Sequence, residues 1–101
     1  MELTKEQRKV LSKWIKENLM PTSKTNYNVD TSEIRESFMS LYIHGFYIDN
    51  YTMNKILREC GFVPSQLSHD PYLRWNISSK SRAIQIYRSS LGGQLKDWMY
   101  E

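Results

Sequence analysis

The chain opens with a helical pattern of hydrophobic positions. Hydrophobic residues recur every three or four positions over residues 4–19, and lysines and arginines fill many of the positions between them. The hydrophobic set is Val10, Leu11, Trp14, Ile15 and Leu19. Thr4 and Gln7 have the spacing of a capping box, in which each side chain bonds a backbone N–H of the first turn. The pattern predicts an amphipathic helix over residues 4–19 that stops before Pro21.

The next segment changes from loop signals to helix signals. Residues 21–28 are polar and turn-rich, so they predict a loop. Asp30 and Glu33 have the spacing of a second capping box. Val29 and Ile34 occupy the two positions of a hydrophobic staple, and we therefore predict a second helix from Asp30. The buried stripe of this helix is Ile34, Phe38, Leu41 and Tyr42.

A third helix follows after a short connection. The pair His44-Gly45 closes the second helix, and residues 46–48 form a short β-prone run. Asp49 or Asn50 is the expected N-cap of the third helix. Its predicted buried face is Met53, Ile56, Leu57 and Cys60.

The end of the third helix is marked by a glycine. Gly61 is expected in the left-handed conformation just past the helix end. Phe62 is then placed to pack back onto Leu57, as in a Schellman motif. These signals predict a helix that ends at about residue 60.

Residues 62–78 have the pattern of a β-hairpin. Phe62 and Val63 lead into a predicted loop over residues 64–71, and residues 72–78 then alternate between apolar and polar positions. One face of this predicted strand carries Leu73, Trp75 and Ile77, and the other carries Tyr72, Arg74, Asn76 and Ser78.

A fourth helix is predicted after the hairpin, with Ser79 or Ser81 as its N-cap. Its hydrophobic positions are Ala83, Ile84, Tyr87 and Leu91. The pair Gly92-Gly93 ends it. We therefore expect a single domain over residues 1–91 and a C-terminal tail or short helix over residues 92–101.

This order of elements predicts an α+β, mainly helical, winged helix-turn-helix-like domain with three helices, a β-hairpin wing and a C-terminal helix. The second and third helices would form the helix-turn-helix, and residues 62–78 would form the wing. An α+β domain that binds no nucleic acid can share the same order of elements, because fold does not determine function.

Several short motifs occur together along the chain. They are residues 45–50, Met53, Leu57, residues 60–62, residues 74–78 and Lys80-Ser81, with a polar-Tyr segment at residues 24–27. Over about residues 5–82 this combination resembles small uncharacterised winged-helix-like proteins of phages and mobile elements of Gram-positive bacteria. The chain departs from that group at residues 52–55 and in the tail after Ser81. The resemblance implies a winged-helix protein of a phage or mobile element, and the group supplies no established chemistry.

Composition narrows the class of protein further. The chain has 101 residues, of which 40% are hydrophobic and 13% aromatic, enough for one core. It has no 18-residue apolar run, and its charged N-terminus does not have the pattern of a signal peptide. One cysteine, Cys60, excludes an internal disulfide and fits a reducing compartment. We expect a cytoplasmic protein of a bacterial host cell that does not bind a membrane.

Catalytic and metal-binding motifs are absent from the sequence. His44 and His69 do not have metal-ligand spacing, and one cysteine cannot build a zinc site. Cys60 is expected to be a core residue rather than a nucleophile. Asp49 and Asp70 are isolated turn residues. We therefore expect no enzymatic activity, no metal and no cofactor.

Charge is distributed unevenly along the chain. The net charge is +3 and the pI is near 9.0, which permits a polyanionic partner without requiring one. Residues 30–60 have a balance of −2, whereas residues 71–96 contain no acid. The basic residues of that second segment are Arg74, Lys80, Arg82, Arg88 and Lys96.

Two groups of side chains are candidates for contact with nucleic acid. On the third helix, Asn and Arg side chains match base edges in the major groove, and a lysine suits phosphate. This group is Tyr51, Asn54, Lys55 and Arg58, which share a predicted face. On the wing and fourth helix, aromatic and basic residues interleave as Tyr72, Arg74, Asn76, Lys80 and Arg82. The alternative for each group is an ordinary solvated surface.

The leading hypothesis from the sequence is a nucleic-acid-binding protein that contacts duplex or single-stranded DNA in transcription control or element replication. The alternative is an interaction protein that inhibits a host or defence protein, as anti-CRISPR proteins do. The tail residues Trp98, Met99 and Tyr100 either pack on the core beside Trp14, form a homodimer contact or dock on such a partner. The sequence leaves these alternatives open.

Overall fold

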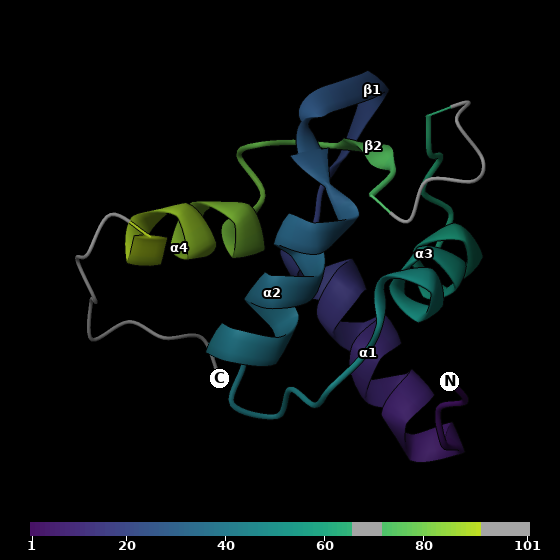
Figure 1. The fold of residues 1–101 in the computed structure, drawn as a ribbon. Coiled ribbons are helices and arrows are strands. Elements are labelled where there is room, and N and C mark those ends of the chain that lie inside the picture. The colour runs from purple at the N-terminus through teal and green to yellow at the C-terminus, as the bar shows by residue number, and fades with distance from the viewer. Residues whose placement is uncertain (66–71, 92–101) are drawn as a thin grey trace.

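The computed structural model describes residues 1–65 and 72–91 and arranges them as four helices and a two-stranded antiparallel sheet (Figure 1). The elements follow in the order α1 (Lys5–Asn18), β1 (Pro21–Asp30), α2 (Thr31–Leu41), α3 (Asn50–Glu59), β2 (Arg74–Ile77) and α4 (Arg82–Leu91). The predicted α+β class is confirmed. Helix α2 lies in the middle, with α3 and α4 on opposite sides of it (Figure 1). The predicted tail and the tip of the predicted wing lie outside the described residues.

Helix α1 matches the sequence prediction closely. The Gln7 backbone N–H donates to Thr4 Oγ1 at 3.1 Å, and the Thr4 backbone N–H donates to Gln7 Oε1 at 2.9 Å. This is the predicted capping box. The predicted hydrophobic positions Leu11, Trp14 and Ile15 are fully buried. Local spacing therefore defined both the start and the buried face of this helix.

Residues 21–28, predicted as a loop, belong to strand β1. This strand pairs antiparallel with β2 and uses more residues than β2 between matched positions, so the register shifts twice. The matched pairs are Pro21 with Ile77, Asn26 with Trp75 and Asp30 with Arg74. The loop prediction was wrong because most side chains of β1 are polar and only Val29 is buried, so no alternating apolar pattern marks the strand, while its backbone pairs with a distant segment.

The predicted hairpin is present in part. The Ser65 N–H donates to the Arg74 carbonyl at 2.7 Å, and the Asn76 N–H donates to the Val63 carbonyl at 3.2 Å. An isolated antiparallel bridge joins Pro64 to Trp75. The short segment 63–65 thus pairs with β2, but the long partner of β2 is β1. Strand β2 therefore lies between β1 and residues 63–65.

The inward face of the predicted strand is confirmed. Leu73, Trp75 and Ile77 are buried, and Tyr72 is exposed. Helix α4 then begins after Ser81, whose carbonyl accepts the Gln85 N–H at 3.0 Å.

Both ends of α3 follow the predicted signals. Asp49, one of the two expected caps, accepts the Thr52 N–H at 2.7 Å. At the other end, the Gly61 N–H donates to the Arg58 carbonyl at 3.0 Å, and the Phe62 N–H donates to the Leu57 carbonyl at 3.1 Å. Gly61 has a φ of +96°. These two bonds and the positive φ form the predicted Schellman motif.

The connection between α2 and α3 is not a strand, although residues 46–48 predicted a β-prone run. Phe46 packs edge-on against Phe38, with ring centroids 5.0 Å apart. Ile48 is fully buried, and its carbonyl accepts a hydrogen bond from Arg35 Nε. Phe46 and Ile48 therefore pack into the core, whereas Tyr47 is exposed. The Arg35 side chain of α2 bonds the Ile48 carbonyl, which in a strand would accept a hydrogen bond from a neighbouring strand.

The core lies where α1, α2, α3 and the sheet meet. Trp14 of α1 packs edge-on against Phe38 of α2, with ring centroids 5.1 Å apart. Trp14 and Trp75 are among the largest fully buried side chains, one from the first helix and one from β2. This packing fixes α3 against α1 and α2 and leaves its remaining face to solvent.

Candidate nucleic-acid interface

Helix α3 presents three of its four predicted contact residues to solvent. We define the α3 stripe as Tyr51, Lys55 and Arg58, which are all exposed. They follow a spacing of four and then three residues, so they lie in one row along the helix. The opposite side of α3 is fully buried through Met53 and Ile56. The stripe is thus held on a helix that is anchored along its length.

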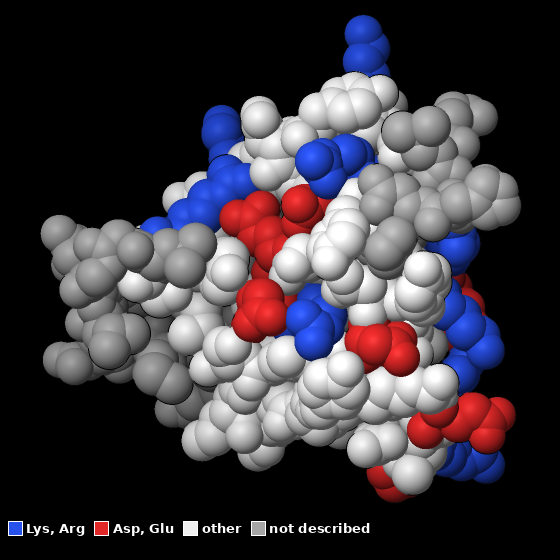
Figure 2. Space-filling view, viewed as in Figure 1, with Lys and Arg blue, Asp and Glu red and all other residues white. Residues whose placement is uncertain are grey.

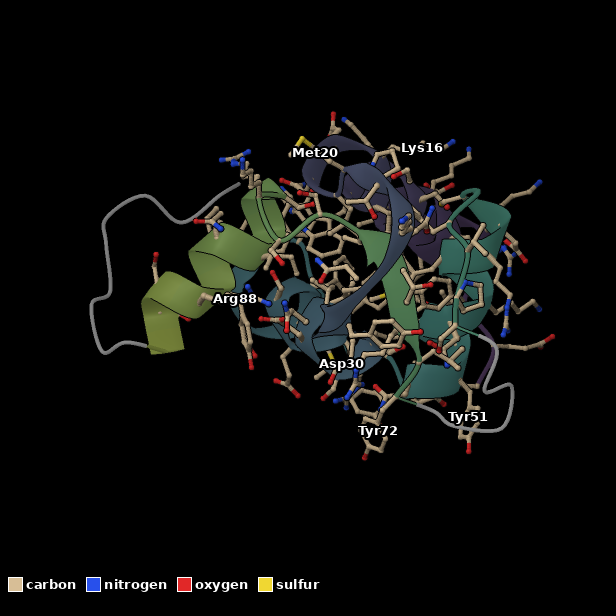
Figure 3. The ribbon with its side chains drawn as sticks, turned by 90° about the horizontal axis from the view of Figure 1, so that it is seen from above. Lys16, Met20, Asp30, Tyr51, Tyr72 and Arg88 are labelled. Carbon is tan, nitrogen blue, oxygen red and sulfur yellow. The ribbon has the colours of Figure 1, made fainter. Side chains whose placement is uncertain are left out.

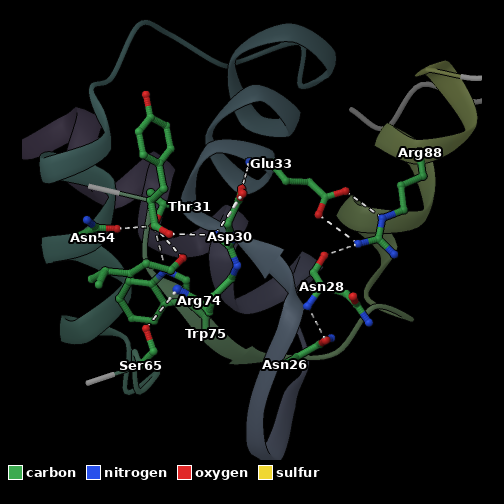
Figure 4. Close-up of polar contacts among 12 residues, drawn as sticks. Asn26, Asn28, Asp30, Thr31, Glu33, Asn54, Ser65, Arg74, Trp75 and Arg88 are labelled. Carbon is green, nitrogen blue, oxygen red and sulfur yellow. Dashed lines mark hydrogen bonds and ion pairs between the residues drawn. The ribbon is translucent and has the colours of Figure 1, made fainter. Parts of the chain in front are cut away.

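Asn54, the fourth residue predicted on this face, is buried instead. It is only 4% exposed, and Asn54 Oδ1 accepts a hydrogen bond from Thr31 Oγ1 (Figure 4). Trp75 Nε1 donates to the same Thr31 hydroxyl at 2.9 Å. The prediction was wrong because Asn54 lies at the edge of the helix face, where it meets the start of α2 and strand β2. Its amide joins a buried polar network and is not available to a base edge.

Two residues of the predicted wing group also have internal roles. Arg74 Nη1 lies 3.3 Å from Asp30 Oδ2 and donates to the Tyr72 carbonyl at 2.9 Å. Asn76 Nδ2 donates to the Thr22 carbonyl at 3.4 Å, and Asn76 Oδ1 accepts the Val63 N–H at 2.7 Å. The Asn76 side chain therefore joins β2 to both β1 and residues 63–65, and the Arg74 side chain joins it to β1.

The remaining members of the wing group are solvent-facing. Tyr72 is 50% exposed, and Lys80 and Arg82 are exposed at the start of α4. Because α4 lies on the other side of α2 from α3, Lys80 and Arg82 are well separated from the α3 stripe (Figure 1). The structure thus does not bring Lys80 and Arg82 to the surface that carries the α3 stripe, whereas Tyr72 lies on the same side of the molecule as Tyr51 (Figure 3).

The charge asymmetry seen along the sequence is offset in part by ion pairs, since two of the basic residues after residue 71, Arg74 and Arg88, each pair with an acid of the segment 30–60. Arg88 Nε donates to Glu33 Oε2 at 2.7 Å, and Arg88 Nη2 donates to Glu33 Oε1 at 3.0 Å. The Glu33 carboxylate raises the pKa of Arg88 above its ordinary value. Arg74 pairs likewise with Asp30. The central face therefore shows acidic and basic groups side by side (Figure 2), and the basic segment after residue 71 is not unopposed.

The structure also brings α1 next to the α3 stripe. Arg8 Nη2 donates to Glu59 Oε1 at 2.7 Å, so the acid at the end of α3 is paired by a cation from α1. The lysines of α1 occupy the positions between its hydrophobic residues and were not among the residues predicted to contact nucleic acid. The packing of α1 on α3 places Arg8, and with it one side of α1, next to the end of α3.

Cys60 closes α3 and is half-buried. Burial raises the pKa of the Cys60 thiol above its ordinary value, while a hydrogen bond with Ser12 and the charge of Lys16 act in the opposite direction. The thiolate form is thereby disfavoured. Among residues 1–65 and 72–91, no cluster of histidine, cysteine and acidic side chains has the arrangement of a metal site. No helix in this part of the chain is long and apolar enough to cross a membrane.

Comparison of the chain with models of protein families, with curated protein sequences and with solved structures found no match. A functional interpretation therefore depends on the geometry of this chain, and above all on the α3 stripe.

Proposed function

We propose that this protein is a small DNA-binding protein of winged-helix type, from a phage or mobile element, that acts in transcription control or element replication. In this proposal α3 is the recognition helix. The winged interpretation is supported by the order of helices and by β2, which lies between β1 and residues 63–65. Residues 63–65 and β2 would be the two sides of the wing.

The observation that carries the DNA-binding proposal is that the residues of the α3 stripe are exposed and that its two cations have no acidic partner among the described residues. Tyr51 is 67% exposed, and Lys55 and Arg58 are exposed in the same row. In the described part of the chain, no carboxylate pairs with either cation. By contrast, Arg74 and Arg88 each form an ion pair within the protein, with Asp30 and Glu33 respectively. Cations without an acidic partner remain available to an anionic ligand.

The chemistry of the stripe suits duplex DNA. The major groove of B-DNA admits an α-helix, and an arginine can bond two acceptors of guanine there. Arg58 takes this role in the proposal, while Lys55 and the Tyr51 hydroxyl contact phosphates. With so few cations on α3, binding is expected to be modest and to weaken quickly as salt rises. Duplex is favoured over single-stranded DNA because the stripe is presented by a rigid helix.

The test is fluorescence anisotropy with labelled duplex and single-stranded DNA of equal length, measured across a salt series starting at about 50 mM. Lys55→Gln and Arg58→Gln should each weaken duplex binding several-fold. Lys80→Gln removes the same charge on the other side of α2 and should leave binding almost unchanged. Absence of binding to either DNA at the lowest salt would overturn the proposal. Loss of binding in Lys80→Gln alone would move the interface to α4.

A second candidate function, inhibition of a host or defence protein, is favoured by the exposed tyrosines in the described part of the chain, which are Tyr27, Tyr47, Tyr51 and Tyr72. Tyrosine is enriched at protein interfaces because it combines apolar area with a hydroxyl. Under this alternative, Tyr47→Ser with Tyr72→Ser should abolish capture of a bacterial partner by the full chain. DNA binding through the α3 stripe predicts instead that this double variant keeps its affinity for duplex.

A further inference from the structure

We propose that α1 supplies a second set of phosphate contacts, so that duplex DNA bound at α3 is also held along α1. The inference rests on the proposed function, because it extends the α3 stripe rather than defining a separate site. We define the α1 lysine face as Lys5, Lys9, Lys13 and Lys16, which are all exposed. Its partner would be the sugar–phosphate backbone beside the groove that α3 enters.

The contacts between the two helices place this face beside α3. Arg8 bonds Glu59, and Ser12 and Lys16 both act on Cys60 at the end of α3. Arg8, Ser12 and Lys16 are spaced by four residues, so they form one row along α1. That row borders α3, and the other lysines of the face follow directly beyond it around the helix.

The acids of α1 lie further away from α3. Glu6 and Glu17 are eleven residues apart, which is about three turns, so they share one side of the helix. At 3.6 residues per turn, that side is nearly opposite Arg8, and the α1 lysine face lies between the two. Lys9 has only a long contact with Glu6, at 4.0 Å and with both side chains well exposed. Such an exposed pair contributes little to stability, so Lys9 can readily exchange Glu6 for a phosphate.

Glu59, the one acid of α3, does not place an uncompensated negative charge between the α3 stripe and the α1 lysine face. Glu59 is paired with Arg8 at 2.7 Å, so its charge is compensated within the protein. In Figure 2, basic side chains run down the right-hand edge of the molecule, over α3 and the start of α1, with acidic ones among them. In Figure 3, Tyr51 and Lys16 point outward at opposite ends of the side formed by α3. A DNA backbone passing over the stripe can therefore continue over the lysines.

The salt dependence of binding tests this inference on the full chain. Each phosphate contact contributes about 0.9 to the slope of log K against log salt concentration. The double variant Lys9→Gln/Lys16→Gln should reduce the slope by about 2 relative to the unaltered protein. The matched double variant Lys80→Gln/Arg82→Gln removes the same net charge near α4 and should leave the slope within about 0.5 of the unaltered value. Urea unfolding of each variant checks that the fold is kept.

The outcomes separate this inference from the proposed function. If the unaltered chain binds no duplex, the proposed function fails and this inference fails with it. If the chain binds, Arg58→Gln weakens binding, and Lys9→Gln/Lys16→Gln keeps the full slope, then α3 stands as the interface and the role of α1 is overturned. An equal loss of slope in both double variants would also overturn it, because net charge rather than position would then explain the effect.

Discussion

Arg88 of α4 holds Glu33 of α2 through two hydrogen bonds, at 2.7 and 3.0 Å, and the same guanidinium donates to the Asn28 carbonyl at 2.6 Å. Glu33 is the third residue of α2, where the sequence predicted that it would complete a capping box. Its carboxylate instead accepts hydrogen bonds from a cation 55 residues away. This contact joins α4, α2 and β1 at one point.

Replacing Arg88 by glutamine should lower the free energy of unfolding by about 1 kcal/mol. Arg88→Lys should recover only part of this, because an ammonium cannot reproduce the two parallel bonds. The matched control is Arg8→Gln, which breaks a more exposed pair that has one hydrogen bond, from Arg8 Nη2 to Glu59. Its cost should stay below about 0.5 kcal/mol. Urea unfolding measures both, and equal costs would contradict the special role of Arg88.

Asn54 should matter for stability rather than for binding. Asn54→Ala leaves the Thr31 hydroxyl without its amide partner in a buried network, and we expect a loss of about 1–3 kcal/mol. Lys55→Ala, one position along the same helix, removes an exposed side chain and should change stability by less than about 0.5 kcal/mol. Urea unfolding and DNA anisotropy on both variants distinguish the two roles. A stable Asn54→Ala protein that binds DNA weakly would reverse this assignment.

The features that could be predicted from the sequence are those that depend on residues close together along the chain. The Thr4–Gln7 box and the Gly61 Schellman motif involve residues at most five apart, so their signals are local. Strand β1 could not be recognised in this way, because its partner begins more than 40 residues later. The prediction that Asn54 is exposed was wrong for the same reason, since Thr31, whose hydroxyl bonds Asn54, lies 23 residues away in the sequence.

The two described glycines should respond differently to alanine. A Cβ on Gly45 would overlap the Phe38 carbonyl and lie 3.0 Å from the Tyr42 carbonyl oxygen, and neither backbone group can swing aside. Gly45→Ala should therefore cost about 2 kcal/mol or more. Gly61 has open space around it but a positive φ, so Gly61→Ala should cost about 1 kcal/mol. Gly61→Asn should be milder than alanine, whereas Gly45→Asn should be worse. A lower urea midpoint for Gly61→Ala than for Gly45→Ala would show that the Gly61 variant is the less stable one, and this would contradict the steric account.

Asp49 should make the stability of α3 depend on acid pH. A hydrogen bond with the Thr52 side chain, followed by one with its backbone N–H, holds the pKa of Asp49 below its ordinary value. A carboxyl whose folded pKa is below its unfolded pKa adds stability above the unfolded value. That stability is lost as the pH falls through the folded pKa. Asp49→Ala should therefore cost about 1 kcal/mol near pH 7 and less in acid.

Asp49→Asn provides the matched control, because asparagine is also a good N-cap but does not titrate. It should keep most of the stability near neutral pH and lose less than the unaltered chain on acidification. Urea unfolding followed by circular dichroism at neutral and acid pH measures all three proteins. If the difference between the unaltered chain and Asp49→Ala is the same at both pH values, the ionised cap is not the source of the stability. If it shrinks in acid while the Asp49→Asn chain changes little relative to Asp49→Ala, the carboxylate of Asp49 is the titrating group that stabilises the start of α3.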